Sequence, residues 1–423
     1  MKTIIQSVKG TRDFYPEDMA VRSWLYNKIR KVSESFGYQE YEGPILEKIE
    51  LYAAKSGEEL VKEQAFVFND RGGELITLRP ELTPTLARMV AQKQNELVFP
   101  LRWWSYGPFW RYERPQKGRT REFFQWNIDL FGALSTDVDA ELIAIAASFL
   151  KEVGLDAEKV KIAVNDRRLM DASIKKLGVD EDKKKAVFRL IDRQDKMSLA
   201  DWKAYGLELG LSEEQVNRLR DIMADHDLWQ ESAELKRIFG ILDKMGLGDY
   251  IQYDARVIRG LEYYTGTVFE ARDASGEGRA IMGGGHYDNL VSDVGGTPLP
   301  GVGFAMGDVM ITVLLKKYDL IPDNLVTRAP VLVTIFDETR VERAYKIASD
   351  LRNSGFDVVC YPEAAKLPKQ FKYADRIGAR FVIVEGPEEE VNGSVTLKDL
   401  RDGSQQIFKL DEVPSKLREL LAP

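Results

Sequence analysis

The chain has 423 residues, of which 44% are hydrophobic and 30% charged, the balance of a folded protein with a sizeable core. At ~150 residues per domain, this length predicts two or three domains. The longest apolar stretch, Leu142–Leu150, is far shorter than the ~20 residues that cross a bilayer, so we expect no membrane segment. The first residues lack an apolar core, so we expect no secretion signal.

The counts of cysteine, histidine and charge limit the chemistry. The single cysteine, Cys360, excludes an intramolecular disulfide and a cysteine-based zinc cluster, and it suits a reducing compartment. The two histidines, His226 and His286, have no partner at metal-ligand spacing, so we expect neither a Ser-His-Asp triad nor a histidine-ligated metal. The net charge of −8 gives no overall attraction to nucleic acid, although a local basic face can still bind phosphate.

The chain starts with a predicted helix and continues with strands. Apolar side chains from Val21 to Phe36 recur at helical spacing, and Gly37 ends this helix. The extended run Tyr38–Leu46 carries Pro44, which confines a strand to a sheet edge or an interface. Strands are then expected at 65–68, 75–78, 101–112 and 122–131. Strands joined by such short connections favour an antiparallel sheet.

The second half changes character twice. Residues 167–249 are rich in Lys, Asp and Glu at helical spacing, which predicts a helical insertion. Strand-like sequence resumes at 250–256 and 265–271, and a helix at 307–318 closes this region. After a linker-like stretch at 321–324, strands and helices alternate, which predicts a separate α/β domain.

The most informative stretch is a basic hairpin. Five cations fall within eleven positions: Arg111, Arg114, Lys117, Arg119 and Arg121. Arginines on both arms of a hairpin can grip a phosphate bidentately, and adenine can stack on Phe123. A solvated basic loop is the alternative that charge alone leaves open.

At these residues the chain resembles the class II aminoacyl-tRNA synthetases, and among them the histidyl-tRNA synthetases. The run Arg111–Arg119 is similar to the second signature motif of the class, and Arg259–Gly266 resembles a motif peculiar to the histidine-specific members. Three further segments match in order: Gly10–Asp13 resembles the family's opening, Gly37–Leu46 the first motif, and Thr77–Pro84 the amino-acid-binding loop. The C-terminal domain resembles the family's anticodon-binding module.

The resemblance implies the fold and the reaction. The fold class is α+β, with an antiparallel-sheet catalytic core over residues 1–325, a mainly helical insertion at about 167–249, and an anticodon-binding α/β domain over 329–423. The reaction is ATP-dependent activation of L-histidine to histidyl-adenylate with release of pyrophosphate, followed by transfer of histidine to the 3′ end of tRNA(His). Mg²⁺ is expected with ATP, and a cytoplasmic homodimer is implied.

The resemblance also implies roles for individual residues. Glu81 and Thr83 hold the α-ammonium group of histidine, and Asp129 and Tyr264 contact its imidazole. Tyr263 is a further substrate-binding residue. Gln125 and Arg111 contact the substrate carboxylate and the α-phosphate. The residues expected to bind ATP are Arg111, Glu113, Arg119, Arg121 and Phe123.

Catalysis is expected to need positive charge and not a general base. The attacking histidine carboxylate is already ionised at pH 7, so the enzyme must position it and stabilise charge on the α-phosphate. The resemblance assigns this role to Arg259, together with Arg111 and Gln125; a buried Arg259 paired with Glu262 is the structural alternative.

A basic helix face is the candidate for tRNA contact. Lys369, Lys372 and Arg376 recur at i+3 and i+4, and phosphates of the anticodon stem would suit them. A solvated helix face is equally consistent with the charge pattern alone.

Two positions depart from the family pattern. Met310 stands where the third motif normally has an arginine, and His286 stands in the arginine position of Gly-Gly-Arg-Tyr-Asp. Two alternative functions remain open. One is a catalytically silent paralogue that serves as the regulatory subunit of an ATP phosphoribosyltransferase, and the other is a histidine-sensing domain of a larger regulator. The anticodon module and the retained Arg111, Arg121 and Arg259 favour the ligase.

Overall fold

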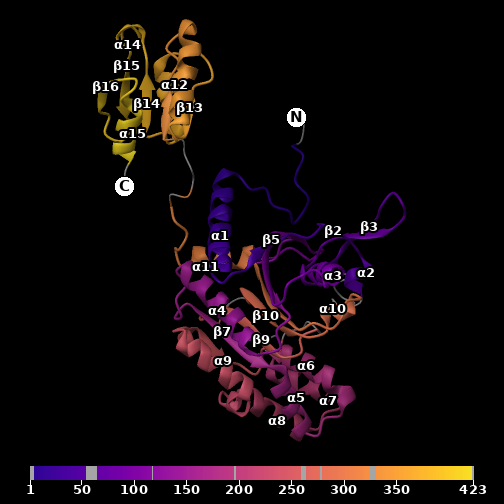
Figure 1. The fold of residues 1–423 in the computed structure, drawn as a ribbon. Helices are drawn as coiled ribbons and strands as arrows, with labels where there is room; N and C mark the ends of the chain where they lie inside the picture. The colour runs from indigo at the N-terminus through magenta and orange to yellow at the C-terminus, as the bar shows by residue number, and fades with distance from the viewer. Residues whose placement is uncertain are drawn as a thin grey trace. The chain divides into compact units, whose positions relative to one another are not determined.

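The computed structural model describes residues 4–53, 64–116, 118–194, 197–258, 263–276, 279–323, 325 and 330–421. The chain divides into two compact units, Met1–Asp323 and Asn324–Pro423 (Figure 1). Within the described ranges, no helix has both the length and the apolar character needed to span a membrane.

The first unit is built on an eight-stranded sheet with the order β1-β5-β6-β11-β10-β9-β7-β8. In that order the strands are β1 (Gln39–Glu40), β5 (Leu101–Trp110), β6 (Glu122–Phe131), β11 (Gly301–Gly307), β10 (Met282–Tyr287), β9 (Thr267–Asp273), β7 (Val160–Asp166) and β8 (Ile251–Tyr253). The outermost pairs, β1 with β5 and β7 with β8, are parallel, and the pairs between them are antiparallel. The expected antiparallel core is therefore confirmed.

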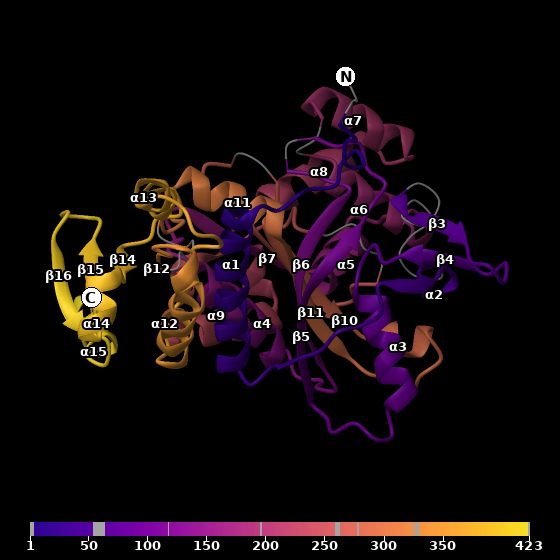
Figure 2. The ribbon, with the colours of Figure 1, turned by 90° about the horizontal axis from the view of Figure 1, so that it is seen from above.

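The two faces of this sheet have different coverings, because side chains alternate along each strand. On one face, Trp126 and Ile128 of β6 join a core with α1 (Pro16–Ser35), α4 (Asp137–Glu152) and α11 (Asp308–Lys317). On the other face, Phe131 packs with α3 (Thr83–Lys93) and α10 (Leu290–Asp293). Figure 2 shows α1 and α4 on one side of β5 and β6, and α3 on the other.

A small antiparallel sheet follows β1 along the chain. It pairs β2 (Leu46–Lys48) and β3 (Phe66–Asn69) with β4 (Leu75–Leu78), next to the short α2 (Glu50–Ala53). The predicted hairpin is the β3–β4 pair. Gly73 in its turn has φ +88°, a backbone conformation that glycine adopts without a Cβ clash.

The expected helical insertion is present between β7 and β8. It contains α5 (Arg167–Lys176), α6 (Lys184–Asp192), α7 (Leu199–Glu208), α8 (Glu213–Ala224) and α9 (Ala233–Lys244), with 3₁₀ turns at Glu181–Lys183, Leu228–Glu231 and Gly248–Tyr250. Serine side chains cap the starts of three of these helices, where free N–H groups need acceptors: Ser198, Ser212 and Ser232. The buried Trp202 ties α7 to α6 by donating to the carbonyl of Leu190 at 2.8 Å.

The second unit contains a five-stranded sheet with the order β13-β12-β14-β15-β16. Parallel strands β12 (Val331–Val333), β13 (Val358–Cys360) and β14 (Phe381–Val384) alternate with α12 (Val341–Asn353) and α13 (Leu367–Arg376), as predicted. The chain then continues through α14 (Pro387–Asn392), the antiparallel strands β15 (Ser394–Asp399) and β16 (Gln405–Lys409), and α15 (Val413–Leu421). The sequence reasoning missed this hairpin, although Asp402-Gly403 is a turn signal and Gly403 has φ +76°.

Gln370 is a test of how the second unit is held together. It is fully buried on α13; its Oε1 accepts the N–H of Ile335 at 2.9 Å, and its Nε2 donates to the carbonyls of Ile335 (2.7 Å) and Ala365 (2.6 Å). Gln370→Leu leaves these buried groups without a side-chain partner, so it should destabilise this unit by about 2–4 kcal/mol. Hydrogen exchange in residues 330–421 measures the loss. Gln405→Ala, at an exposed position on β16, should change nothing; wild-type protection in Gln370→Leu would contradict the prediction.

Candidate active site

A cavity of about 460 Å³ lies against β6, β10 and β11 and collects most of the predicted site residues. The predicted residues that line it are Glu81, Thr83, Arg111, Arg119, Gln125, Asp129, Tyr263 and Tyr264. The lining also contains residues that the sequence reasoning did not find, among them Gln64, Asn127, Asp192, Glu270 and Tyr287. Segments far apart in the sequence therefore meet in one place.

The space exists because two strands present very small residues toward it. Gly283 of β10 and Gly303 and Ala305 of β11 line the cavity. The alternate residues of β11, such as Met306, fill the core on the opposite face. A Cβ on Gly303 would lie 2.1 Å from Oδ1 of Asp129, so only glycine permits this close approach of β11 to the carboxylate.

Asp129 is an acid inside the sheet, with only 3% of its surface exposed. Burial raises its pKa to about 7, and the hydrogen bond donated by the Tyr287 hydroxyl opposes part of that rise. Such a carboxylate gains from an N–H donor brought by a ligand, because burial has removed the water that would otherwise solvate it.

Three tyrosine rings form the wall beside Asp129. The ring centroids of Tyr263 and Tyr264 are 4.8 Å apart, and those of Tyr263 and Tyr287 are 5.8 Å apart. An aromatic wall next to a buried acid can hold a flat ring that carries an N–H donor. This chemistry suits an imidazole.

The Glu81–Thr83 loop is fixed from beneath by a buried arginine. The fully buried Arg79 forms an ion pair with Glu42 and donates to the carbonyls of Gly43 and Pro108, each at 2.9 Å. The loop therefore leads into α3 in a set position, with Glu81 buried and the half-buried Thr83 at the first turn of the helix. The sequence reasoning did not assign Arg79 this supporting role.

Two arginines of the basic hairpin line the cavity, and a third, Arg121, makes contacts within the hairpin itself. Arg111 and Arg119 line the cavity; Nε of Arg111 donates to the carbonyl of Pro80 at 3.0 Å. Arg119 also pairs with Glu113 at 2.8 Å. Arg121 stacks over the Tyr112 ring at 4.0 Å and donates to the Glu113 carbonyl at 3.3 Å.

Not every predicted ATP contact lies at this cavity. In the described hairpin, Glu113, Arg121 and Phe123 lie beside the lining residues without joining them. The Phe123 ring instead has the Arg111 guanidinium 5.4 Å from its centroid and the Phe109 ring at 5.9 Å. Arg259, Glu262 and Lys117 lie outside the described residues.

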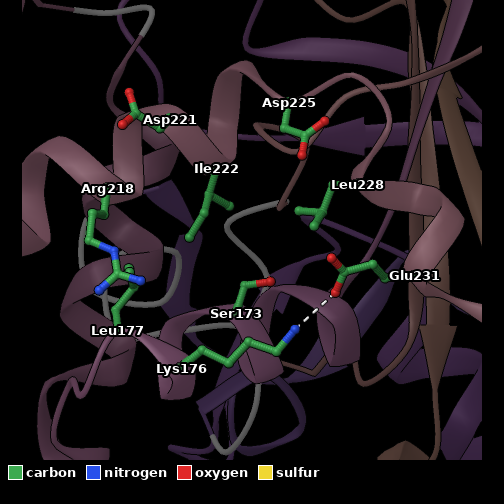
Figure 3. A pocket seen from close by; sticks show the side chains of 9 residues that line it. All are labelled: Ser173, Lys176, Leu177, Arg218, Asp221, Ile222, Asp225, Leu228 and Glu231. Atoms are coloured by element: carbon green, nitrogen blue, oxygen red, sulfur yellow. Dashed lines mark hydrogen bonds and ion pairs between the residues drawn. The ribbon is translucent and has the colours of Figure 1, made fainter.

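A second cavity, of about 360 Å³, lies in the helical insertion between α5, α8 and the 3₁₀ turn that follows α8 (Figure 3). Lys176 and Glu231 form an ion pair of 2.9 Å across it, and Arg218 projects nearby. None of the predicted site residues lines this cavity, so the first cavity remains the candidate active site.

The predicted tRNA-binding residues lie in the second unit. Lys369, Lys372 and Arg376 are exposed along α13, while Gln370 and Ala374 form its buried face. Lys369 also pairs with Glu363 at 2.9 Å. The three cations therefore share a solvent-exposed side of one helix.

Comparison with known proteins identifies the family of this chain. A sequence model described as histidyl-tRNA synthetase matches residues 10–309, and one described as anticodon binding domain matches residues 329–420. The chain belongs to the histidyl-tRNA synthetase family. It is a class II aminoacyl-tRNA synthetase that ligates histidine to tRNA with ATP as a substrate.

Relatives of this synthetase match along nearly its whole length. A histidine–tRNA ligase of Arabidopsis thaliana, named chloroplastic/mitochondrial, is 39% identical over 97% of this chain and 86% of its own. A histidine–tRNA ligase of Leptospira biflexa is 35% identical over 100% of this chain and 99% of its own. The crystal structure of histidyl-tRNA synthetase from Nostoc sp. PCC 7120 covers 99% of this chain and 100% of its own, with a TM-score of 0.82 and 26% identity.

The regulatory alternative is not favoured. A Bacillus halodurans structure, titled ATP phosphoribosyltransferase regulatory subunit/histidyl-tRNA synthetase, has a TM-score of 0.74 but only 22% identity, so it supports the fold alone. It covers 88% of this chain and 97% of its own. The full-length relatives are ligases, and the second unit matches an anticodon-binding domain.

The close approach at Gly303 gives a direct test of the site. Gly303→Ala forces β11 away from Asp129, so the Michaelis constant for histidine should rise by roughly tenfold or more, as expected when a site is displaced by ~1 Å. Histidine-dependent exchange of pyrophosphate into ATP measures this effect. A Cβ on Gly307, at the end of the same strand, meets nothing within 4 Å, so Gly307→Ala should keep the wild-type melting temperature. Wild-type histidine activation by Gly303→Ala would contradict the predicted close packing.

Proposed function

We propose that the 460 Å³ cavity is where histidine is activated, with Asp129 and Tyr264 facing the imidazole ring. The observation that carries this proposal is a buried acid beside an aromatic wall, in the same cavity as Arg111 and Arg119. An amino acid without a ring N–H would leave the buried Asp129 with the Tyr287 hydroxyl but without the second donor, and a missing hydrogen bond in a buried site costs more than a poor apolar fit. Glu81 and Thr83 supply oxygen acceptors for the α-ammonium group at the other end of the substrate.

In the first step, an oxygen of the histidine carboxylate attacks the α-phosphorus of ATP while the bond to pyrophosphate breaks. No proton is transferred, because both the carboxylate and the leaving pyrophosphate are anions near pH 7. We propose that Arg111, which lines the cavity, stabilises charge on the α-phosphate and that Gln125, also in the lining, orients the carboxylate. We propose the same electrostatic role for Arg259 from its position in the histidine-specific motif.

Mg²⁺ is proposed to enter with ATP. Gln125 and Glu270 present oxygen donors in the cavity that contains Arg111 and Arg119, and oxygen is the ligand that Mg²⁺ prefers. Gln125 and Glu270 would hold the ion, and Mg²⁺ bound with ATP would supply positive charge against the leaving pyrophosphate.

In the second step, a ribose hydroxyl at the 3′ end of tRNA(His) attacks the carbonyl carbon of histidyl-adenylate; the histidyl ester forms, and AMP and the hydroxyl proton are released. We propose that residues 329–423 bind the anticodon stem through α13, that residues 1–325 carry catalysis, and that residues 167–249 form an insertion within the catalytic part. The cytoplasm is the proposed location, since a tRNA ligase works where translation takes place.

A homodimer is proposed through the first motif and the small sheet. Exposed apolar side chains gather there: Ile45, Leu46, Val67, Phe68 and Leu75. An apolar surface of this kind is typical of a protein interface, because its exposure to water is unfavourable.

Asp129→Asn tests the reader of the imidazole. Asparagine keeps the size but loses the acceptor charge, so histidine-dependent pyrophosphate exchange should fall by roughly 10²-fold or more. The folded pKa of Asp129, about 7, lies above the ordinary value of 3.8, so its ionised form opposes folding increasingly as the pH rises from about 4 to 7. The variant should therefore melt no lower than wild type at pH 8.

The exposed Asp243 on α9 provides the control, because Asp243→Asn should leave both exchange and melting unchanged. Wild-type histidine affinity in Asp129→Asn would show that another group recognises the imidazole.

The tRNA-binding helix is tested by replacing Lys369, Lys372 and Arg376 together with Gln. The Michaelis constant for tRNA should rise roughly tenfold and depend less steeply on salt, because fewer counterions are released from phosphates. Pyrophosphate exchange, which needs no tRNA, should be unchanged. Three exposed cations elsewhere in this unit give a charge-matched control: Lys346, Arg401 and Lys409. If both triple variants charge tRNA equally well, α13 is not the tRNA-binding surface.

A further inference from the structure

One buried titratable side chain beside the site has no role in the mechanism above. His286 lies on β10 between Gly285 and Tyr287, with 10% of its side chain exposed. Its Nδ1 is 2.8 Å from Oδ1 of Asp139, a fully buried residue of α4. Its Nε2 is 3.1 Å from Oδ1 of Asp288, whose side chain is 49% exposed. Each ring nitrogen therefore faces a carboxylate.

Both carboxylates also hold the segment that follows Tyr264. Asp288 accepts the hydroxyl of Thr265 at 2.7 Å, and Asp139 accepts the hydroxyl of Thr267 at 2.7 Å. The N–H of Thr265 donates to the backbone carbonyl of His286 at 2.8 Å. His286 is thus connected to Thr265 and Thr267, which lie on either side of Gly266. Its backbone carbonyl accepts the N–H of Thr265, and the two carboxylates that face its ring accept the two threonine hydroxyls.

The same strand supports this segment from its other face. A Cβ on Gly285 would lie 2.8 Å from Cδ1 of Tyr264, so the ring packs directly on the strand at that position. Two residues further along the strand, Tyr287 lines the cavity and donates to Asp129. Three consecutive residues of β10 therefore set the positions of Tyr264, the Thr265–Thr267 segment and Asp129.

We propose that His286 is a positioning residue for histidine recognition: as an imidazolium it bridges Asp139 and Asp288 and holds the segment that carries Tyr263 and Tyr264 against the cavity. Only the protonated ring can donate from both nitrogens. A neutral ring would leave one carboxylate oxygen facing a nitrogen lone pair, and the contact to Asp139 or to Asp288 would be lost.

The charges around His286 favour the protonated form. Burial alone would lower its pKa, but hydrogen bonding to Asp139 and the charges of Asp139 and Asp288 outweigh burial and raise it. Arg168 of α5 is the nearby cation; its guanidinium would lie 3.5 Å from a Cβ on Gly266, and it pairs with Asp166 at 2.6 Å. Glu234 of α9 offsets part of the charge of Arg168.

The direction of the pH effect follows from this raised pKa. The bridging form is complete below the pKa of His286 and is lost as the pH rises through it. The Michaelis constant for histidine should then increase, whereas kcat should change less, because the bridge acts on substrate placement. The loss of one charged hydrogen bond corresponds to a change of about tenfold.

Nuclear magnetic resonance can follow His286 directly, since the chain has only two histidines. His226 is exposed, and His226→Gln leaves a single protein imidazole signal while pyrophosphate exchange stays at its wild-type level. That signal should titrate above the ordinary histidine pKa of ~6.5. A pKa below that value would overturn the proposal.

The kinetic test compares wild type with His286→Arg in histidine-dependent pyrophosphate exchange across pH. Arginine stays charged at every pH used and can donate to both carboxylates. Ionisation of the substrate and of Asp129 affects both proteins alike, so it cancels in the ratio of their Michaelis constants. The Michaelis constant of wild type divided by that of the variant should increase about tenfold as the pH rises through the pKa of His286. A ratio that stays flat would overturn the proposal.

Asp288→Asn gives a second test that does not depend on placing arginine in a buried position. Asp288 is half-exposed, and asparagine keeps an oxygen acceptor of the same size there; removing the carboxylate charge should lower the pKa of His286. The midpoint of the Michaelis-constant profile should move to lower pH together with the resonance. A resonance that moves while the kinetic midpoint stays would contradict the proposal.

This inference rests on the proposed placement of histidine beside Tyr263 and Tyr264, and the two can fail separately. Tyr264→Phe with wild-type histidine affinity would remove the proposed placement. An unaltered kinetic profile in His286→Arg, with Tyr264→Phe impaired, would leave that placement intact and reject the role of His286 alone.

Discussion

The candidate active site depends on two neighbouring strands, β10 and β11, that present very small residues to one face of the sheet. Gly283, Gly303 and Ala305 leave a hollow in the centre of the antiparallel sheet, and Asp129 lies buried at its floor. Burying this carboxylate costs free energy, as its raised pKa shows, and a ligand N–H recovers part of that cost. The glycines that open the cavity also bring β11 close to Asp129, so the shape of the cavity and the proposed recognition of an N–H donor have one structural origin.

The cavity walls are held in place by contacts that never touch the substrate. Arg79 is buried beneath the loop that carries Glu81 and donates to the carbonyl of Pro108, near the end of β5. Arg111 of the basic hairpin donates to the carbonyl of Pro80 in the same loop. Arg121 supports the hairpin from outside the cavity. Because hairpin and loop fix each other, the groups proposed to bind phosphate and ammonium lie at set positions before either substrate enters.

Sequence patterns were most informative where a short segment determines its own structure. The β3–β4 hairpin, the strands on either side of the basic loop and the helices of the insertion were all predicted, because turn residues and periodicity are local signals. Asn127, Glu270 and Tyr287 were missed as cavity residues, since no local pattern tells which face of a strand lines a cavity. A signal was nevertheless present: glycines at alternate positions of Gly301–Gly307 mark one empty face.

Met310 lies in the first turn of α11, where contacts with the basic hairpin and with β6 begin. Asp308, the first residue of this helix, is buried; burial raises its pKa, and the charge of Arg12 at 2.8 Å opposes that rise. The same carboxylate accepts the N–H of Phe124 at 2.9 Å, so it anchors the start of β6.

Two residues on, the sulfur of Met310 would lie 2.6 Å from a Cβ on Gly118 and thus packs on the hairpin turn. A thioether offers polarizable contact without charge, so among the described lining residues the cations proposed to face the phosphates are Arg111 and Arg119. The helix that would otherwise supply an arginine instead holds the hairpin that carries these two.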